Sequence, residues 1–177
     1  MVCTGNICRS PAMHYLAQRE WGEAAEVSSA GIYAENGMDV PSPMRLAASH
    51  HDLTIPPHSP TQLDRVLLAQ ANLVLVATSQ HARWIENEWG EPLSHSFGIK
   101  EAAELAHRTP PPAGATPQER LVNMASTLDT ARRLDSAPLR SLDDPWSRDQ
   151  DTYDRVMNEI ADDIAVLTGW ARLGVHP

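Results

Sequence analysis

The chain has 177 residues, the size of one domain, and 42% of them are hydrophobic, which is enough for one core. Its formal net charge of −9 disfavours general binding to nucleic acid or to an anionic membrane surface, since both are polyanions. No apolar run reaches the roughly 20 residues of a membrane-spanning helix, and no secretory signal pattern opens the chain, so a soluble, cytoplasmic protein is expected.

Apolar residues recur at helical spacing in some segments and form short unbroken runs in others. The run at 71–78 is the clearest strand, because it does not alternate with polar residues, as is typical of parallel sheets. In chain order, the pattern predicts a helix at 11–21, a strand at 27–31, helices at 41–49 and 61–69, a strand at 71–78, a helix at 80–88, a strand at 94–99, and helices at 101–107, 118–134 and 152–173.

Strands that alternate with helices indicate an α/β fold with a parallel sheet. We expect a three-layer sandwich with a central, mostly four-stranded parallel sheet, in one domain that spans residues 1–177. Residues 108–117 hold four prolines and are expected to form a surface loop, within a longer insertion of loop and helix at 108–140, rather than a linker between domains.

The segment CTGNICRSP at residues 3–11 is expected where a strand ends and the first helix begins, the place where α/β folds bind ligands. Successive backbone amides, the positive end of the helix dipole and the guanidinium of Arg9 predict a pocket for a dianionic phosphate. Cys3 opens this loop, and the field that holds an anion also favours its thiolate over the thiol. Cys3 is therefore the candidate nucleophile.

Other residues of the loop fit the same role. Gly5 lets the backbone turn inward, and Asn6 tolerates a left-handed conformation in which its side chain bonds loop carbonyls. Ser10 is expected to be the N-cap of the helix, with Pro11 at the first helical position, and to donate a hydrogen bond to the Cys3 sulfur.

A proton donor for the leaving group is expected in the segment SLDDPW at 141–146. The residue before a proline is held in an extended conformation, which allows the Asp144 carboxyl to lie over a neighbouring pocket. Asp143 is the competing candidate. Because Asp-Pro is by itself a common turn, this assignment depends on its pairing with the thiol loop.

At these residues the sequence resembles the low-molecular-weight protein tyrosine phosphatases. Residues 2–11 match the phosphate-binding loop of that family, and Asp144-Pro145-Trp146 matches its late acid loop. Ser29-Ala30-Gly31 and the strand at 71–78, with His81 after it, are similar as well, so the resemblance covers most of the chain.

The resemblance implies removal of phosphate from protein tyrosine through a cysteinyl-phosphate intermediate, with no metal and no cofactor. Cys3 would be the nucleophile, Arg9 the clamp on the phosphate and the transition state, and Asp144 the general acid and then the base. Cys8 would form a reversible disulfide with the nucleophile, which implies redox regulation. Phosphate binding is implied for Thr4, Gly5, Asn6, Ile7, Cys8, Arg9 and Ser10.

The resemblance also bears on substrate and partners. Ile7 favours phosphotyrosine, because tyrosine-directed members carry isoleucine there and arginine-phosphate phosphatases of this fold carry threonine. Trp146 and Tyr33 are expected to form a wall for a phenyl ring, whereas Glu35 stands near where many bacterial relatives have another aromatic residue. The expected partner is a phosphotyrosine protein, with no nucleic acid and no membrane, and the chain is expected to be a monomer or a weak dimer.

The start of the chain departs from the family, in which several apolar residues form the central strand ahead of the loop. Only Met1 and Val2 precede Cys3. Either the true start lies upstream, or the first strand is truncated to a stub, in which case we expect that the loop loses its anchor and core burial suffers. A chain extended upstream by an apolar strand is expected to be more stable and more active, and equal melting temperature and turnover would contradict this.

Two other functions stay open. An arsenate reductase of the same fold passes oxidation to further cysteines, but the chain has only Cys3 and Cys8. A catalytically impaired binder of phosphate or phosphopeptides is the second alternative, and the short first strand keeps it open. A metal site at His50, His51 and His58 is disfavoured, because these side chains lie in a polar, proline-rich loop and are expected to be solvated.

Overall fold

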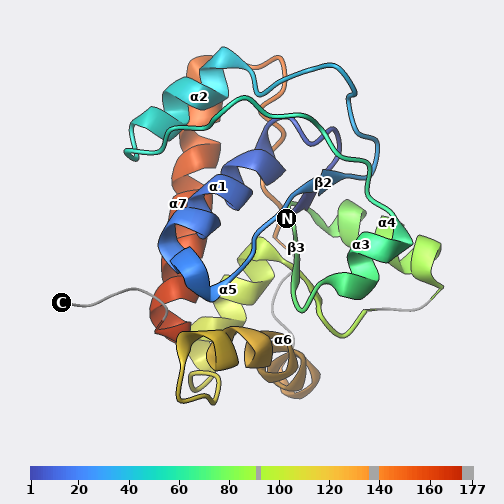
Figure 1. Cartoon of the computed structure of the whole chain (residues 1–177), viewed down its shortest axis with the longest axis vertical. Coiled ribbons are helices and arrows are strands. Elements are labelled where there is room, and N and C mark those ends of the chain that lie inside the picture. The colour runs from blue at the N-terminus through green and yellow to red at the C-terminus, as the bar shows by residue number, and fades with distance from the viewer. Residues whose placement is uncertain (91–92, 136–139, 173–177) are drawn as a thin grey trace.

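The computed structural model describes residues 1–90, 93–135 and 140–172 (Figure 1). Its centre is a sheet of four parallel strands in the order β2-β1-β3-β4, which confirms the expected α/β fold. The strands are β1 (Val2–Cys3), β2 (Ala30–Gly31), β3 (Val74–Val76) and β4 (Ser96–Gly98).

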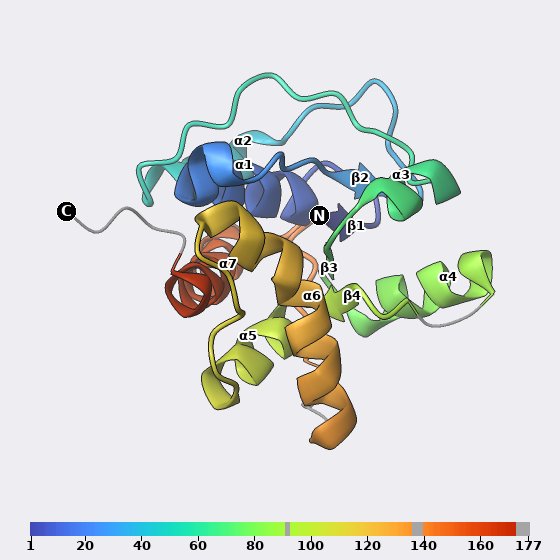
Figure 2. The same cartoon turned by 60° about the horizontal axis from the view of Figure 1, so that its bottom comes forward.

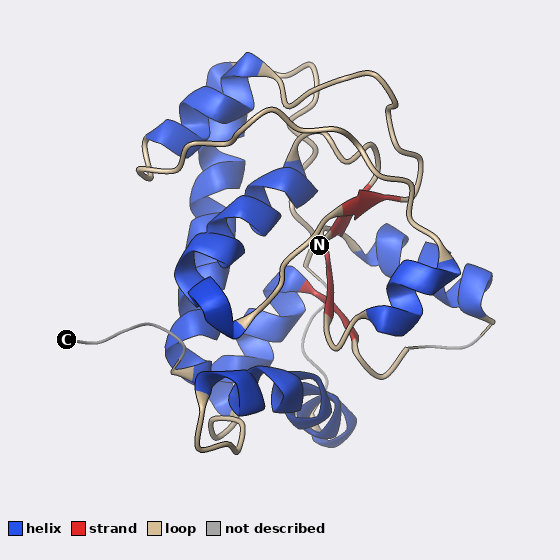
Figure 3. Cartoon of the chain, viewed as in Figure 1, coloured by secondary structure: helices blue, strands red, loops and turns tan. Residues whose placement is uncertain are grey.

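The helices are α1 (Arg9–Trp21), α2 (Ser42–Ser49), α3 (Arg65–Gln70), α4 (Ser79–Trp89), α5 (Ile99–Arg108), α6 (Pro117–Leu134) and α7 (Gln150–Ala171), with a 3-10 turn η1 at Gly22–Ala24. They cover both faces of the sheet, as Figures 2 and 3 show. The helices α3 and α4 lie on one side, and α1, α2, α5 and α7 form the layer on the other. The expected three layers are therefore present.

Side chains along each strand alternate between two apolar cores, as the pleat of a strand requires. Val2, Val74 and Val76 belong to the core beneath α3 and α4, whereas Cys3 and Leu75 belong to the larger core around α7. Four apolar residues of α7 at helical spacing are fully buried in that larger core: Val156, Ile160, Ile164 and Leu167.

The first strand is a stub of two residues, as expected, but it is held on both sides. Val2 pairs with Ala30 of β2 and with Val76 of β3. The Cys3 carbonyl accepts a hydrogen bond from the Ile32 amide at 3.0 Å, and both strand residues are buried. The expectation that the loop loses its anchor is therefore wrong, because two residues in the middle of the sheet are bonded to both neighbours. The gain expected from an added strand stays a prediction.

The helix predicted at 61–69 begins later than expected. Residues 61–63 run beside β2 instead, where a bridge joins Gly31 to Gln62. The helix α3 begins after Asp64, whose carboxylate accepts a hydrogen bond from the Leu67 amide at 2.9 Å and so caps the first turn. Residues 61–63 thus lie along the edge of the sheet and next to the loop that follows β1.

The described part of the segment 108–140 contains α6, which packs against α5 and α7. Its N-terminus is a capping box, in which the Thr116 hydroxyl accepts from the Glu119 amide at 3.2 Å and the Glu119 carboxylate accepts from the Thr116 amide. In the part of the chain that the structure describes, no helix is both long enough and apolar enough to cross a membrane.

Candidate active site

The loop between β1 and α1 contains backbone amides that have no acceptor. The amides of residues 5–8 donate no hydrogen bond to another described residue, and no side chain caps the first turn of α1. Asn6, Ile7 and Cys8 are nevertheless buried. Because buried donors without acceptors are costly, and because the positive end of the helix dipole lies here, this loop is suited to hold an anion.

Arg9 brings a buried guanidinium to the same loop. The residue is 4% exposed, and its Nη1 donates to the Leu142 carbonyl at 3.4 Å. Its Nη2 lies 2.9 Å from a carboxylate oxygen of Asp144. The Nε atom is buried and has no hydrogen-bond partner among the described residues. An oxyanion in the loop would supply the missing acceptor.

Cys3, at the start of the loop, touches Ser10. The sulfur and the hydroxyl oxygen are 3.0 Å apart, and both residues are buried. The Ser10 hydroxyl accepts a hydrogen bond from the side-chain Nδ2 of Asn6 at 2.9 Å, so its own proton can be donated to the sulfur, as predicted, or to the Ala30 carbonyl at 3.4 Å. The predicted N-cap role of Ser10 is wrong, because α1 already begins at Arg9 and the hydroxyl is engaged by Cys3 and Asn6.

Asn6 holds the loop in shape from within. Its φ of 56° is the predicted left-handed conformation. Its Nδ2 donates to the hydroxyls of Ser10 and Ser29, each at 2.9 Å. Its Oδ1 accepts from the Thr61 amide at 2.8 Å and from the His58 ring at 3.2 Å. The prediction that this side chain bonds loop carbonyls is therefore wrong, since within the loop it bonds only the Ser10 hydroxyl and its other partners come from segments farther along the chain.

His58 supports Asn6, although the sequence predicts a solvated side chain at this position. Its Nε2 lies 3.0 Å from the Asn6 carbonyl and 3.2 Å from Oδ1, and both are acceptors, so Nε2 carries the proton. Its Nδ1 therefore accepts from the Tyr15 hydroxyl at 3.2 Å. Burial lowers the pKa of His58. The proline-rich loop folds back over Asn6, which partly buries this histidine.

His14 is a second histidine that sequence analysis missed. Its Nδ1 lies 3.3 Å from the Ser29 hydroxyl, and its ring stacks on Tyr15 with centroids 4.3 Å apart. Burial lowers the pKa of His14 to about 4, and the positive charges of the N-terminus and of His58 act in the same direction. The ring is therefore neutral at pH 7, and its Nδ1 can accept a hydrogen bond from the Ser29 hydroxyl.

His81 joins α4 to the loop. Its Nδ1 accepts a hydrogen bond from the Thr78 amide at 3.1 Å, so Nε2 carries the proton and donates it to the Thr4 hydroxyl at 3.0 Å. Burial, followed by the positive charge of Arg9, lowers the pKa of His81 to about 4. The resemblance pointed to this residue without a role, and the structure places it against the loop.

Gly31 allows β2 to approach the loop closely. A Cβ atom at this position would lie 2.5 Å from the Thr4 carbonyl oxygen and 2.9 Å from the Asn6 amide nitrogen. Both are backbone atoms, which cannot turn away as a flexible side chain does. Only glycine fits here without displacing the loop.

Asp144, rather than Asp143, faces the loop. The Asp144 carboxylate pairs with Arg9, whereas Asp143 pairs with Arg155 of α7 at 2.9 Å. The segment is attached to the sheet through Leu142, whose amide donates to the carbonyl that follows β3 at 2.9 Å. Of the two carboxylates that the sequence left open, the structure thus brings one to the loop.

The two predicted wall residues are exposed side chains beside these elements. Tyr33 is 64% exposed, its amide donates to the Thr4 carbonyl at 3.0 Å, and its ring meets Trp84 edge-on with centroids 6.2 Å apart. Trp146 is 43% exposed, and its amide donates to the Asp144 carboxylate at 3.3 Å. The backbone amide of each residue is therefore hydrogen-bonded to a residue of the candidate site, Thr4 for Tyr33 and Asp144 for Trp146.

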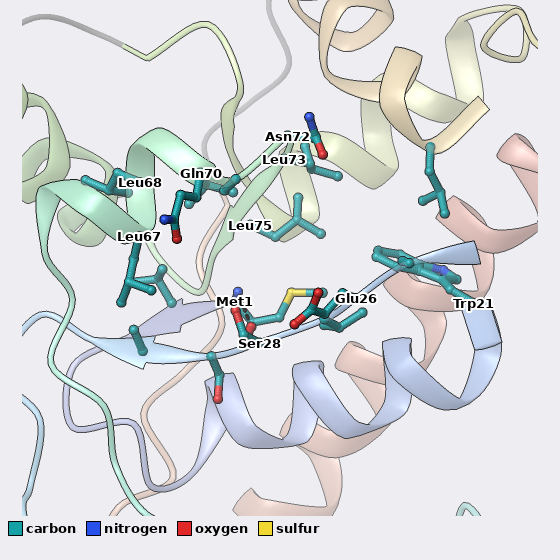
Figure 4. A pocket seen from close by; sticks show the side chains of 18 of the residues that line it. Met1, Trp21, Glu26, Ser28, Leu67, Leu68, Gln70, Asn72, Leu73 and Leu75 are labelled. Atoms are coloured by element: carbon teal, nitrogen blue, oxygen red, sulfur yellow. Dashed lines mark hydrogen bonds between the residues drawn. The ribbon is translucent and has the colours of Figure 1, made fainter. Parts of the chain in front are cut away.

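A cavity of about 500 Å³ lies elsewhere, at the N-terminal end of the sheet (Figure 4). Met1, Ser28 and Leu73 contribute to its lining, whereas the loop leaves the carboxyl end of β1. The cavity is therefore separate from the candidate active site. Within the described ranges, no group of three or more His, Cys, Asp or Glu side chains is arranged to hold a metal ion.

Comparison with known proteins agrees with this geometry. A family model described as low molecular weight phosphotyrosine protein phosphatase matches residues 1–107. A low molecular weight protein-tyrosine-phosphatase from Acinetobacter johnsonii is 34% identical over 89 residues, which are 50% of this chain and 62% of that protein. A protein-arginine-phosphatase from Bacillus subtilis is 36% identical over 111 residues, which are 60% of this chain and 72% of that protein.

Solved structures share the fold. The tyrosine phosphatase Wzb from Escherichia coli K30, in complex with sulphate, matches 97% of this chain and 93% of its own, with a TM-score of 0.66 and 22% identity. The YwlE arginine phosphatase from Geobacillus stearothermophilus matches 95% of this chain and 88% of its own, with a TM-score of 0.69 and 21% identity. Because the family model covers more than half of the sequence, the chain belongs to the low molecular weight phosphotyrosine protein phosphatase family.

Proposed function

We propose that the protein hydrolyses phosphate monoesters of protein tyrosine through a phosphorylated Cys3. The observation that supports this most is the loop itself: backbone amides and the Arg9 Nε that have no partner among the described residues lie in the same loop as the buried sulfur. A bound phosphate would accept hydrogen bonds from the loop amides and from Arg9 Nε, and it would lie next to the Cys3 sulfur. Within this proposal, Thr4, Gly5, Asn6, Ile7, Cys8, Arg9 and Ser10 form the phosphate site.

In the first step, the Cys3 thiolate attacks phosphorus in line with the bond to the phenolic oxygen. The S–P bond forms, the P–O bond breaks, and protonated Asp144 donates its proton to the departing phenolate. Arg9 binds the phosphate throughout this step. Arg9 and the loop amides stabilise the charge on the equatorial oxygens.

In the second step, the Asp144 carboxylate takes a proton from water, whose oxygen attacks phosphorus. The P–S bond breaks and inorganic phosphate leaves. The Ser10 hydroxyl, 3.0 Å from the sulfur, donates a hydrogen bond to the returning thiolate and so makes it a better leaving group. The cycle ends with the enzyme in its starting state.

Ile7 supports phosphotyrosine as the substrate, and Trp146 and Tyr33 would contact its ring. Arginine phosphate is the second candidate, because some relatives are named protein-arginine-phosphatases. Parallel assays with phosphotyrosine and phosphoarginine peptides separate the two. We expect faster turnover of phosphotyrosine, and Ile7→Thr to shift the ratio toward phosphoarginine. A native preference for phosphoarginine would contradict the assignment.

We further propose that Cys8 protects the nucleophile. Burial, followed by the charges of Cys3 and Asp144, raises the pKa of Cys8 to about 12, so Cys8 is a thiol at neutral pH. Hydrogen peroxide would oxidise Cys3 to a sulfenic acid, and condensation with the Cys8 thiol would form a disulfide and release water. Both thiols are free in the structure, and a reducing cytoplasm would keep them so.

The enzymatic proposal is tested by hydrolysis of a small aryl phosphate and by binding of inorganic phosphate. Wild type should turn over the ester, and Cys3→Ser should lose on the order of 10⁴-fold or more in kcat while still binding phosphate. A wild type that binds phosphate but hydrolyses nothing would favour the binding protein instead. Activity that survives in Cys3→Ser would contradict the cysteinyl-phosphate mechanism.

A further inference from the structure

The carboxylate of Glu35, which the mechanism does not use, belongs to a segment that lies against the exposed part of the phosphate loop. Thr4 and Gly5 are the least buried residues of this loop, and the segment after β2 is attached to them. The Glu35 amide donates to the Gly5 carbonyl at 3.0 Å. A Cβ atom on Gly5 would lie 2.9 Å from Glu35 Cγ, so this side chain rests directly on the loop.

The backbone that carries Glu35 is held at several consecutive positions. The Tyr33 amide bonds the Thr4 carbonyl, the Ala34 amide bonds the Gln62 side chain at 3.0 Å, and the Glu35 carbonyl accepts from the Met38 amide at 3.1 Å. Tyr33 also packs its ring against Trp84. The position of Glu35 at the loop is therefore built into the fold, unlike that of an ordinary surface glutamate.

The carboxylate of Glu35 is exposed, and no cation pairs with it among the residues that the structure describes. The other acidic side chain beside the loop, Asp144, has Arg9 as its partner, and Asp143 has Arg155. A substrate that brings phosphate to Arg9 therefore meets one uncompensated negative charge at the rim. A positive charge next to the phosphotyrosine would pair with it, and a negative charge would be repelled.

We propose that Glu35 is a specificity-determining residue that selects phosphotyrosine sites with a lysine or arginine next to the phosphotyrosine and disfavours acidic sites. This inference rests on the proposed phosphatase function and adds the substrate class to it. The occupant of the rim is thus a basic phosphopeptide segment, recognised by charge beside the phosphate rather than by a further pocket.

The test compares kcat/KM for two phosphotyrosine peptides that differ only in the residues flanking the phosphotyrosine, lysine in one and glutamate in the other. A single exposed charge pair changes such a constant by about two- to fivefold, so exchanging attraction for repulsion gives on the order of tenfold in favour of the lysine peptide at low salt. High salt should bring the ratio toward one, because the charges are screened.

Glu35→Gln should bring the ratio close to one, a fall on the order of tenfold, because both the attraction and the repulsion are removed, and Glu35→Arg should reverse the preference. Glu23→Gln, an equal charge change at an exposed residue beyond the far end of α1, is the matched control and should keep the ratio. Because the ratio is taken within each variant, differences in folding or in active enzyme concentration cancel.

A ratio that is the same in wild type and Glu35→Gln would overturn this inference, as would an equal change in Glu23→Gln. Hydrolysis of a small aryl phosphate that lacks flanking residues distinguishes the two levels of the proposal. If wild type shows no preference between the two peptides but retains Cys3-dependent turnover of the aryl phosphate, the role of Glu35 alone is contradicted. Absence of all turnover contradicts the phosphatase assignment itself.

Discussion

The phosphate loop and its rim are built in opposite ways. Asn6, Arg9 and Ser10 in the loop are almost fully buried, and the side-chain hydrogen-bonding groups of Asn6 are all engaged. At the rim, Tyr33 and Trp146 expose 64% and 43% of their surface. Buried side chains that are held by hydrogen bonds keep the loop in one geometry for the reaction, whereas an exposed rim accepts varied substrates. Changes in the loop should therefore lower kcat, and changes at the rim should alter KM.

Asp144 is the sharpest case, because it is exposed like the rim but pairs with Arg9 of the loop. We expect Asp144→Asn to lower kcat by about 10²–10⁴-fold for an aryl phosphate with a poor leaving group, since an amide cannot donate the required proton. Asp143→Asn, which only breaks the pair with Arg155, should stay within about twofold. Equal losses in the two variants would contradict the assignment of Asp144 as the acid.

Substitution of Gly31 tests whether the loop depends on the close approach of β2. Gly31→Ala should lower the free energy of unfolding by about 1–3 kcal/mol, because the added Cβ meets loop backbone, and should lower kcat as well. Gly169→Ala is the matched control. That residue lies within α7 with nothing near its Cβ position, so the substitution should stabilise by up to about 1 kcal/mol. Urea denaturation measures the free energy of unfolding. A Gly31→Ala variant as stable as wild type would show that the loop tolerates displacement.

The neutral histidines predict a pH dependence of stability. The pKa values of His14 and His81 are lowered from 6.5 to about 4, so the unfolded chain binds more protons between these pH values. The stabilisation is fully present above pH 6.5 and is lost as the pH falls toward 4, by up to about 1.4 kcal/mol per pH unit for each group and less for the partly exposed His14. Denaturation at several pH values measures this, and His81→Gln should flatten the slope.

The smallest effects are expected for the aromatic rim residues. Trp146→Ala and Tyr33→Ala should each raise KM for an aryl phosphate by about two- to tenfold, because an aromatic contact contributes about 0.5–1.5 kcal/mol. Steady-state kinetics should show little change in kcat. A fall in kcat with constant KM would mean that the rim takes part in the reaction, and it would remove the distinction between the two regions.

Much of the fold and of the loop is predictable from sequence, because the signals are local. The apolar runs and helix patterns locate most elements, and residues 3–10 are contiguous, so their chemistry is recognisable without neighbours. The partners of Asn6 are not predictable in this way. His58 and Thr61 are more than 50 residues away in the chain, and no pattern in the proline-rich segment distinguishes a buried histidine from a solvated one.

The amino-acid sequence by itself determined that a thiol and a guanidinium lie on one turn of chain at a helix N-terminus, because that geometry needs only nine consecutive residues. The tertiary structure decided which aspartate meets Arg9, why Gly31 has no side chain, and why His14 and His81 stay neutral. These outcomes depend on desolvation and on close contacts between segments far apart in the chain, which arise only once the sheet and its helices are packed.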